Sequence, residues 1–293
     1  MKCCRGSNEF GDLISGRSLI KAPETVNGDA EVVDPKLRHV ATSYAAKSSA
    51  APRMVQPVHC AVAKRLPTEG NLFVSKREIP PQVWQLDAAS LSDANKALRI
   101  LPGELRPYNH GLRMVGRAVT VTASADLVPV LAGLEQCGAG EVLVVDAGTT
   151  KHAVLGELFA TEAVRRGLAG IVVYGLCRDT ATLAELSLPI YSLGTIPRAV
   201  GATALPITQQ PVRLGDVEVR PGEILVGDDD GIVVLSDEEL DAALETAGAI
   251  QQREDAIRAA MRNGTSLFDQ LNFHEHVANL QAGQSSSLAF RVQ

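Results

Sequence analysis

The hydrophobic pattern of the chain changes period repeatedly from about residue 85 onward, between the apolar runs of buried strands and the spacing of helices. Apolar runs rich in β-branched residues predict strands, at residues 115–122, 141–146, 170–174 and 188–192. Helical spacing lies between them, at residues 127–137 and 156–166. Gly138 and Gly167 are placed to end these two helices. Such alternation is typical of an α/β domain whose sheet is partly parallel.

The two ends of this region have other patterns. Residues 87–100 have helical spacing, and Ser92 or Asp93 could cap a helix that starts late. The second half is rich in short predicted strands, at residues 217–219, 223–227 and 231–235. Ser236 and Glu239 have the spacing of a capping box, so a long helix is expected from there to about Arg262. We therefore expect a compact α/β sandwich with a partly parallel central sheet, a β-rich second half and a long C-terminal helix.

Charge divides the chain into unlike parts. Residues 1–80 hold 12 Lys and Arg against 8 Asp and Glu, a net charge of +4, so the rest of this chain of net charge −6 carries −10. The first segment also lacks sustained apolar periodicity, and we expect an irregular or disordered N-terminal extension there. The α/β domain is expected over 85–273 and a surface tail over 274–293. The extension lacks the apolar stretch of a secretory signal, so the cytoplasm is the expected location, with organelle targeting by the extension as the alternative.

Composition excludes several classes of protein. No run approaches 18 apolar residues, which argues against a membrane span. A net charge of −6 and 4% aromatic residues argue against a nucleic-acid partner. The five cysteines form no CxxC pair, so neither a disulfide framework nor a structural zinc site is expected. A globular protein of a reducing compartment remains.

Chemistry-bearing side chains gather in the unit from Glu141 to Asp179, where a predicted helix lies between two predicted strands. A right-handed crossover would make these strands parallel, with both carboxyl ends at one edge of the sheet. Arg178 and Asp179 would then meet the helix that begins near Gly156, although 20 residues separate Glu157 from Arg178. Open α/β sheets bind their ligands at this edge.

These residue types suit a small 2-oxo acid. A helix N-terminus offers N–H groups to a carboxylate, and Arg178 can donate paired hydrogen bonds to a carboxylate or keto oxygen. Asp179 and Glu157 are oxygen ligands of the kind that Mg²⁺ or Mn²⁺ prefers. A metal and an arginine would stabilise an enolate, which aldol cleavage and decarboxylation both require. The plainer alternative is an Arg–Asp ion pair beside a glutamate at a favourable helix start. His152, just before the helix, could relay a proton or be an ordinary loop histidine.

Several segments resemble, in order, the RraA-like family, which includes 4-hydroxy-4-methyl-2-oxoglutarate aldolases and the regulator of ribonuclease E activity A. The longest is VLVVDAGTTKHAVLGELFATEAVRRGLAGIVVYGLCRD at 142–179. The shorter ones are GRAVTV at 116–121, LGTIPR at 193–198, PGEILVGDDDGIVV at 221–234 and GTSLFDQLNF at 264–273. Together the resemblance spans about residues 90–273.

The resemblance implies a role for individual side chains. Arg178 matches the arginine that holds the pyruvyl group, and Asp179 matches the metal-binding aspartate. Glu157 matches the acid at the helix start, close to the metal and its waters. Aldolase members often carry an acid three residues after the metal aspartate, whereas this chain has Thr182, which puts the native aldol substrate in doubt more than the metal.

The resemblance also implies a ligand-binding backbone and an assembly. The amides around Gly156, Leu158 and Phe159 match those that bind the substrate carboxylate. Members form trimers or hexamers with sites at subunit interfaces, and an acid from a neighbour's C-terminal helix often completes the site. Glu254 is the candidate for that acid.

Two functions follow as expectations. The first is a divalent-metal-dependent lyase, of the class II aldolase type, that cleaves 4-hydroxy-4-methyl-2-oxoglutarate to pyruvate or decarboxylates oxaloacetate. The second is a non-catalytic regulator that binds a ribonuclease or another protein partner. The joint presence of Glu157, Arg178 and Asp179 favours the first.

Overall fold

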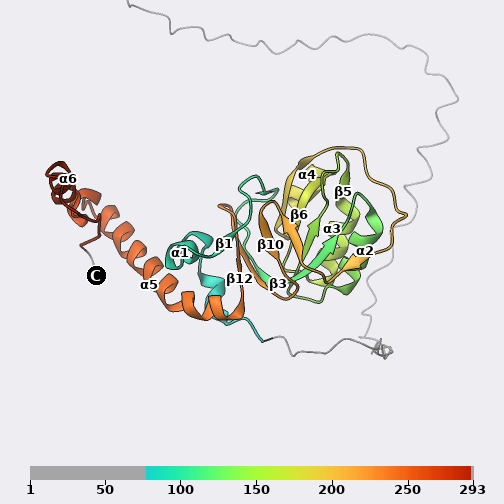
Figure 1. The fold of residues 1–293 in the computed structure, drawn as a ribbon, viewed down its shortest axis with the longest axis horizontal. Coiled ribbons are helices and arrows are strands. Elements are labelled where there is room, and N and C mark those ends of the chain that lie inside the picture. Colours follow the sequence, from blue (N-terminus) through green and yellow to red (C-terminus); the bar gives the residue numbers. More distant parts are fainter. Residues whose placement is uncertain (1–76, 292–293) are drawn as a thin grey trace, which may run out of the picture. The chain divides into compact units, whose positions relative to one another are not determined.

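A ten-stranded sheet is the main feature of the computed structural model, which describes residues 77–291 (Figure 1). Most of the predicted N-terminal extension, 1–80, therefore lies outside the described residues. The main path of the sheet runs β1–β12–β11–β3–β4–β6–β7–β2, with β5 on β6 and β8 on β3 as side pairings. The strands of this path are β1 (Arg99–Ile100), β2 (Arg106–Pro107), β3 (Met114–Thr122), β4 (Glu141–Asp146), β6 (Gly170–Cys177), β7 (Ile190–Thr195), β11 (Ile224–Gly227) and β12 (Ile232–Leu235). The structure thus confirms the expected mixed α/β fold with its partly parallel sheet.

The centre of the sheet is parallel and its flanks are antiparallel. Strands β3, β4, β6 and β7 pair in parallel, as does the short β5 (Ala153–Leu155) with β6. The flanking strands β11, β12, β1 and β2 and the side strand β8 (Ile207–Thr208) pair antiparallel. The central strands are almost wholly buried, which explains why they appear in the sequence as continuous apolar runs.

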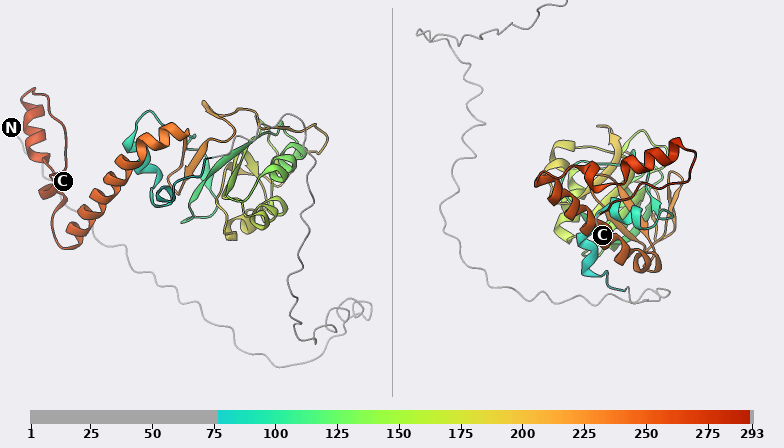
Figure 2. Two further views of the ribbon diagram at one scale, coloured as in Figure 1. Left: turned by 90° about the horizontal axis from the view of Figure 1, so that it is seen from below. Right: turned by 90° about the vertical axis from the view of Figure 1, so that its left-hand side faces the viewer.

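Different elements cover the two faces of the parallel centre. One face packs against helices α2 (Leu127–Gln136), α3 (Glu157–Arg166) and α4 (Thr180–Glu185), which contribute buried residues such as Leu134, Ala160 and Leu183 to a common apolar cluster. The other face packs against a hairpin of β9 (Val212–Leu214) and β10 (Val217–Val219). Figures 1 and 2 show α2, α3 and α4 grouped at one end of the sheet and α1 and α5 at the other.

Helices α1 (Ala88–Ala94) and α5 (Asp237–Arg262) enclose a third apolar cluster with β11 and β12. The capping box of Ser236 and Glu239 is present, as predicted, and α5 ends at Arg262. The helix predicted over 87–100 is wrong in its second half. Asp87 caps it, and it stops before Asn95, whose side-chain Oδ1 accepts the Ala97 N–H. The chain then leaves the helix to pair β1 with β12.

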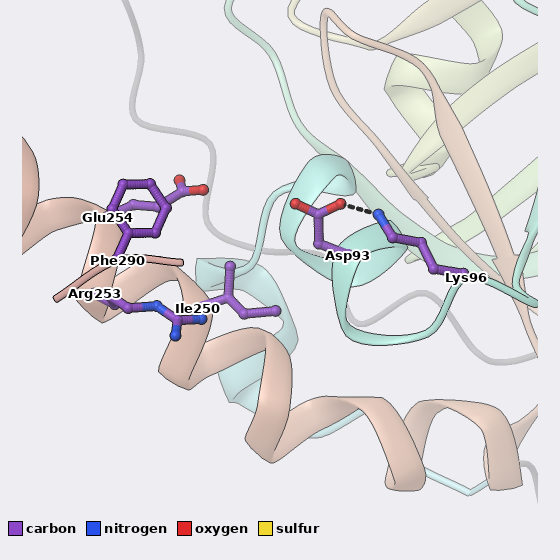
Figure 3. Close-up of a pocket in the computed structure, with 6 residues that line it drawn as sticks. All are labelled: Asp93, Lys96, Ile250, Arg253, Glu254 and Phe290. Atoms are coloured by element: carbon purple, nitrogen blue, oxygen red, sulfur yellow. Dashed lines mark hydrogen bonds and ion pairs between the residues drawn. The ribbon is translucent and has the colours of Figure 1, made fainter. Parts of the chain in front are cut away.

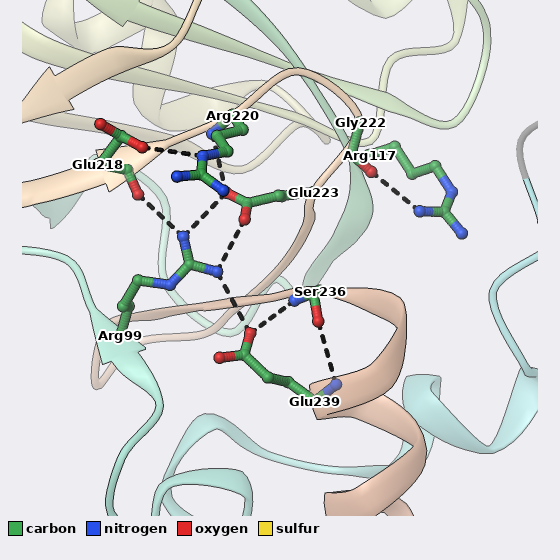
Figure 4. A network of polar contacts seen from close by, with 8 residues as sticks. All are labelled: Arg99, Arg117, Glu218, Arg220, Gly222, Glu223, Ser236 and Glu239. Carbon is green, nitrogen blue, oxygen red and sulfur yellow. Dashed lines mark hydrogen bonds and ion pairs between the residues drawn. The ribbon is translucent and has the colours of Figure 1, made fainter. Parts of the chain in front are cut away.

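A network of charged side chains joins β1, the β10–β11 turn and the start of α5 (Figure 4). The guanidinium of Arg99 donates to both carboxylate oxygens of Glu223, at 3.0 and 2.8 Å, and to Glu239 at 3.2 Å. The Arg99–Glu223 pair is largely shielded from solvent, because the Glu223 side chain is only 13% exposed, so the loss of either partner would leave a poorly solvated charge. Nearby, Arg117 donates to the Gly222 carbonyl and to Asp237, the first residue of α5.

The chain beyond α5 forms a small unit with little buried surface. It holds the 3₁₀ helix η3 (Leu267–Gln270) and α6 (Phe273–Gln281), and α6 has no buried residue. The predicted tail, 274–293, therefore includes most of a helix. A second 3₁₀ helix, η2 (Pro81–Gln85), precedes α1. Among residues 77–291, no helix has the length and apolar character needed to cross a membrane.

Candidate functional site

The carboxyl ends of the parallel strands bring Glu157, Arg178 and Asp179 together. Arg178 and Asp179 directly follow β6, and Glu157 is the first residue of α3, which starts after β5. The short β5 sets the meeting point, because it pairs with the end of β6 and the Arg178 N–H donates to the Leu155 carbonyl at 3.0 Å. The predicted juxtaposition is therefore present in the structure, whereas the chemical role of each side chain stays a prediction.

Gly156 permits this close approach. A Cβ at this position would lie 2.6 Å from Oδ2 of Asp179 and 2.9 Å from Cγ of Arg178. Its backbone is extended, with φ −154°, so the requirement for glycine comes from space and not from conformation. The absence of a side chain at 156 lets the N-terminus of α3 lie directly against the two charged residues.

Asp179 is held in an unusual backbone conformation. Its φ of 60° and ψ of 40° are left-handed, which is uncommon for a residue other than glycine and costs free energy that the surrounding structure must offset. Its side chain makes no capping bond to its own helix α4. Instead Oδ2 accepts the Glu157 N–H at 3.1 Å and lies 3.5 Å from Nε of Arg178. Asp179 therefore joins α3 to the end of β6.

A cavity of about 270 Å³ opens beside these residues, large enough for a small organic acid. Its lining comes from the ends of β6 and β7 and consists of Arg178, Asp179, Thr180, Thr195, Ile196 and Pro197. The side chains of Arg178 and Asp179 are 43% and 39% exposed, so both reach a ligand from solvent. The cavity is thus lined by a guanidinium group, a carboxylate and two hydroxyl groups.

The two apolar residues at the start of α3 differ in orientation. Leu158 is 77% exposed, whereas Phe159 packs against the buried cluster under α3. What both share is a place in the first turn of the helix, where backbone N–H groups have no partner within the helix. The Glu157 N–H is already taken by Asp179, so the amides of Gly156, Leu158 and Phe159 are those that stay candidates for a carboxylate.

Neither His152 nor Glu254 lines this cavity. His152 is in the loop before β5, where its N–H donates to Thr150. Glu254 is on α5 and lines another cavity, of about 310 Å³, with Asp93, Lys96, Ile250, Arg253 and Phe290 (Figure 3). It pairs there with Arg258 at 3.4 Å. Within this subunit's described residues, the two cavities share no lining residue.

Sequence reasoning assigned no role to several residues that the structure brings to the site. Thr180, Thr195, Ile196 and Pro197 line the cavity, although only the segment containing the last three was singled out, as LGTIPR. Cys177, directly before Arg178, is fully buried, and burial raises the pKa of its thiol to about 12. A reactive thiolate at this position is therefore excluded.

Comparison with known proteins places this architecture in a family. A protein of Halalkalibacterium halodurans with the provisional name 4-hydroxy-4-methyl-2-oxoglutarate aldolase is 34% identical over 182 residues, which are 61% of this chain and 87% of that protein. The 4-hydroxy-4-methyl-2-oxoglutarate aldolase of Thermus thermophilus is 34% identical over 50% of this chain and 89% of its own length. The crystal structure of Streptomyces coelicolor RraAS2, described as an unusual member of the RNase ES inhibitor RraA family, superposes with a TM-score of 0.54 at 29% identity, over 62% of this chain and 98% of that one.

A family model agrees with these individual similarities. The model described as RraA-like, Aldolase/RraA, matches residues 88–234, from the first helix to the last strand of the sheet. This range contains Gly156, Glu157, Arg178 and Asp179. The chain belongs to the RraA-like family.

Proposed function

We propose that this protein is a divalent-metal-dependent lyase that releases pyruvate from 2-oxo acids, by retro-aldol cleavage of 4-hydroxy-4-methyl-2-oxoglutarate, by decarboxylation of oxaloacetate, or by both. The observation that carries the proposal is the contact of Arg178 and Asp179 with the N-terminus of α3, which Gly156 makes possible. The aldolase names of two relatives at 34% identity support the reaction class.

The substrate's 2-oxo acid end fits the charges of this site. Its carboxylate would accept hydrogen bonds from the amides of Leu158 and Phe159, where the partial positive charge of the helix N-terminus adds to the attraction. Arg178 would donate to the 2-oxo oxygen. As the carbon–carbon bond breaks, its electrons move toward that oxygen, and a cation fixed beside it stabilises the growing negative charge.

The residues present fit a cation that keeps part of its water shell. Among residues 77–291 no group of three or more His, Cys, Asp and Glu side chains is gathered as a full ligand set. Mg²⁺ does not need one, because it commonly binds through one or two carboxylates, with waters and substrate oxygens completing its shell. Asp179 would supply one carboxylate and Glu157 a second, directly or through water. When bound, such an ion polarises the 2-oxo group as a Lewis acid.

Proton movement completes the reaction. In retro-aldol cleavage the 4-hydroxyl proton leaves as its oxygen becomes a carbonyl, and carbon 3 of the enolate later gains a proton to give pyruvate. Decarboxylation of oxaloacetate loses carbon dioxide and reaches the same enolate. Glu157, whose carboxylate is exposed and whose N–H contacts Asp179, would act as the base, and His152 in the loop before β5 could assist through water.

We also propose that the protein works in the cytoplasm as a homotrimer or hexamer whose neighbouring subunit completes the site. The support is the large apolar side chains left exposed at the end of α5, at Met261, and in the C-terminal unit beyond it, at Leu267, Phe268, Leu280, Leu288 and Phe290. Such side chains favour burial against another surface. In this assembly Glu254 of one subunit would serve the site of the next.

The test is pyruvate release from each of the two substrates, with Mg²⁺ and then with EDTA. The proposal expects release that EDTA abolishes and added Mg²⁺ or Mn²⁺ restores, and the ratio of rates ranks the substrates. A folded, metal-supplied protein that releases no pyruvate from either substrate contradicts it.

A non-catalytic regulator is the second candidate, because RraAS2 belongs to a family described as ribonuclease inhibitors. An acidic domain could dock on a basic segment of a partner protein. Capture of a ribonuclease that Asp179→Ala leaves unchanged, together with the absence of turnover, would favour this function.

A further inference from the structure

The hydroxyl groups of the partly buried Tyr108 and the buried Ser192 meet next to Gly194, the residue before the β7 part of the cavity lining. The Tyr108 hydroxyl donates to the Gly194 carbonyl at 2.9 Å, and the Ser192 hydroxyl donates to the Tyr108 oxygen at 2.8 Å. Ser192 is also linked to Gly194, whose N–H donates to the Ser192 oxygen at 3.1 Å. The buried thiol of Cys177, at the end of β6, neighbours both hydroxyls. The group therefore spans the adjacent ends of β6 and β7.

Each end of this network leads to a lining residue of the cavity. Cys177 is followed by Arg178 and Asp179, and Gly194 is followed by Thr195, Ile196 and Pro197. The β6–β7 ladder continues to the pair Cys177–Thr195, and beyond it the Ile196 N–H donates to the Cys177 carbonyl at 2.9 Å where the two segments enter the site. The hydroxyl pair adds side-chain bonds to this backbone link.

The sheet is irregular at this place. Val173 pairs with Ser192 and Leu176 with Gly194, so β6 has one residue more than β7 between these pairs, which is a bulge. Gly194 also has a φ of 154°, a backbone conformation that other residues rarely adopt. A bulge re-aims the strand that follows it, and that strand end carries Arg178.

Tyr108 reaches this place from a segment that contributes no lining residue to the cavity. Its N–H donates to the Ile190 carbonyl at 2.9 Å, and the preceding β2 pairs with β7. Burial raises the pKa of Tyr108 far above its usual value, so the hydroxyl keeps its proton and remains a donor at any working pH.

We propose that Tyr108 and Ser192 are positioning residues, whose hydroxyl pair fixes the Arg178–Asp179 end of β6 against the Thr195–Pro197 end of β7. The role in the reaction rests on the proposed lyase function. Because electrostatic stabilisation depends on the exact placement of the donor, a loosened strand end lowers the rate although substrate and metal ligands are all retained.

The test compares Tyr108→Phe with Tyr191→Phe. Tyr191 is a matched control: it is buried, and its hydroxyl donates to the Asp228 carbonyl at 3.0 Å, at the turn between β11 and β12. Both changes remove one hydroxyl and one bond to a backbone carbonyl. Pyruvate release is measured with Mg²⁺ to give kcat and KM, Mn²⁺ affinity is measured by titration followed by electron paramagnetic resonance, and thermal unfolding reports the fold.

We expect Tyr108→Phe to lower kcat about tenfold or more with KM little changed and to weaken Mn²⁺ binding, while Tyr191→Phe stays within about twofold of the unaltered protein. Ser192→Ala should have a similar effect, and the double variant should be no worse than either single one, because both disrupt one unit. Equal kinetics and Mn²⁺ affinity for the two tyrosine variants, or effects of Tyr108→Phe and Ser192→Ala that simply multiply, would overturn the inference. An unaltered protein without activity would instead overturn the lyase function and, with it, this role.

Discussion

Gly156 shows how one missing side chain can determine a site. Its position would place a Cβ inside the contact distance of both Asp179 and Arg178. Since Asp179 Oδ2 must approach the α3 N-terminus to accept the Glu157 N–H, any side chain here pushes that carboxylate away. Gly156 is the N-cap residue of α3, and the space that its missing side chain leaves is filled by the two charged residues of the site.

Gly156→Ala should lower kcat/KM for pyruvate release by about tenfold or more, because it displaces both charged groups. The matched control is Gly248→Ala in α5, where a Cβ meets no atom within 4 Å. That control should keep full activity and gain about 0.5–1 kcal/mol of unfolding free energy from better helix propensity. Steady-state kinetics and chemical denaturation check both; equal activity of the two variants would show that the close contact at 156 is dispensable.

Asp126 gives a second prediction for a single residue. Its carboxylate caps α2 at Val128 and accepts bonds from Thr203 and Ala204, which fasten the loop after β7. These bonds, led by the one from the Thr203 N–H, lower its pKa below the ordinary 3.8. A lowered folded-state pKa means that the ionised form stabilises the fold above pH 4 and that this stabilisation is lost as the pH falls through the folded-state pKa.

Asp126→Asn should therefore lower the thermal unfolding midpoint at pH 7, and the difference from the unaltered protein should shrink below about pH 4. Differential scanning calorimetry from pH 7 to pH 3 measures this. A difference that stays constant with pH would mean that the charge of Asp126 makes no contribution.

At the scale of elements, the ion-pair network of Arg99 joins parts of the chain that are far apart in sequence. Arg99 in β1 contacts Glu223 before β11 and Glu239 in α5. Arg99→Ala would leave the mostly buried Glu223 without its cation, which should cost about 1–3 kcal/mol of unfolding free energy. Arg258→Ala, which removes two exposed ion pairs on α5, with Glu254 and Asp255, should change stability little. Urea denaturation compares them, and equal midpoints would contradict the structural role of Arg99.

The predictability of the elements follows from how local their signals are. The start of α5 at Ser236 and the central strands carry strong local patterns and were predicted within a few residues. The error at 87–100 arose because β1 is defined by pairing with β12, more than 130 residues away, and only two residues long. Strands β5 and β2 were missed for the same reason: they are short and depend on long-range partners.

The site followed the same rule. Crossover handedness was enough to place Arg178 and Asp179 beside the start of α3, because parallel strands end at one edge. The network of Tyr108, Ser192 and Cys177 had no sequence signal, since each residue comes from another segment and only the packed sheet joins them. The predicted role of Glu254 depends on the site of a neighbouring subunit, and that of His152 depends on a substrate or water with which it exchanges a proton. The contacts within one subunit therefore test neither role.

At the scale of the whole molecule, the C-terminal unit has the fewest internal contacts to explain its structure. Helix α6 buries no residue, and the large apolar side chain of Leu280 on it is 55% exposed. If this surface contacts a second copy, Leu280→Glu should shift sedimentation velocity from a trimer or hexamer to smaller species, whereas Gln281→Glu, with the same new negative charge next to it, should not. A single species of unchanged size for Leu280→Glu would contradict a contact through this surface.

The most direct test of the account is the kcat/KM for pyruvate release by Arg178→Ala beside Arg165→Ala, each with Mg²⁺. Arg165 lies on α3, the helix that begins at the proposed site, and within residues 77–291 it pairs with Glu162 of its own helix, at 2.6 Å, so its removal takes the same charge from a position outside the site. The account predicts that Arg178→Ala loses at least about a hundredfold, as expected for a donor aimed at developing negative charge, while Arg165→Ala remains close to the unaltered protein. Equal activity of the two variants would contradict the assignment of the reaction to the edge where β6 meets α3.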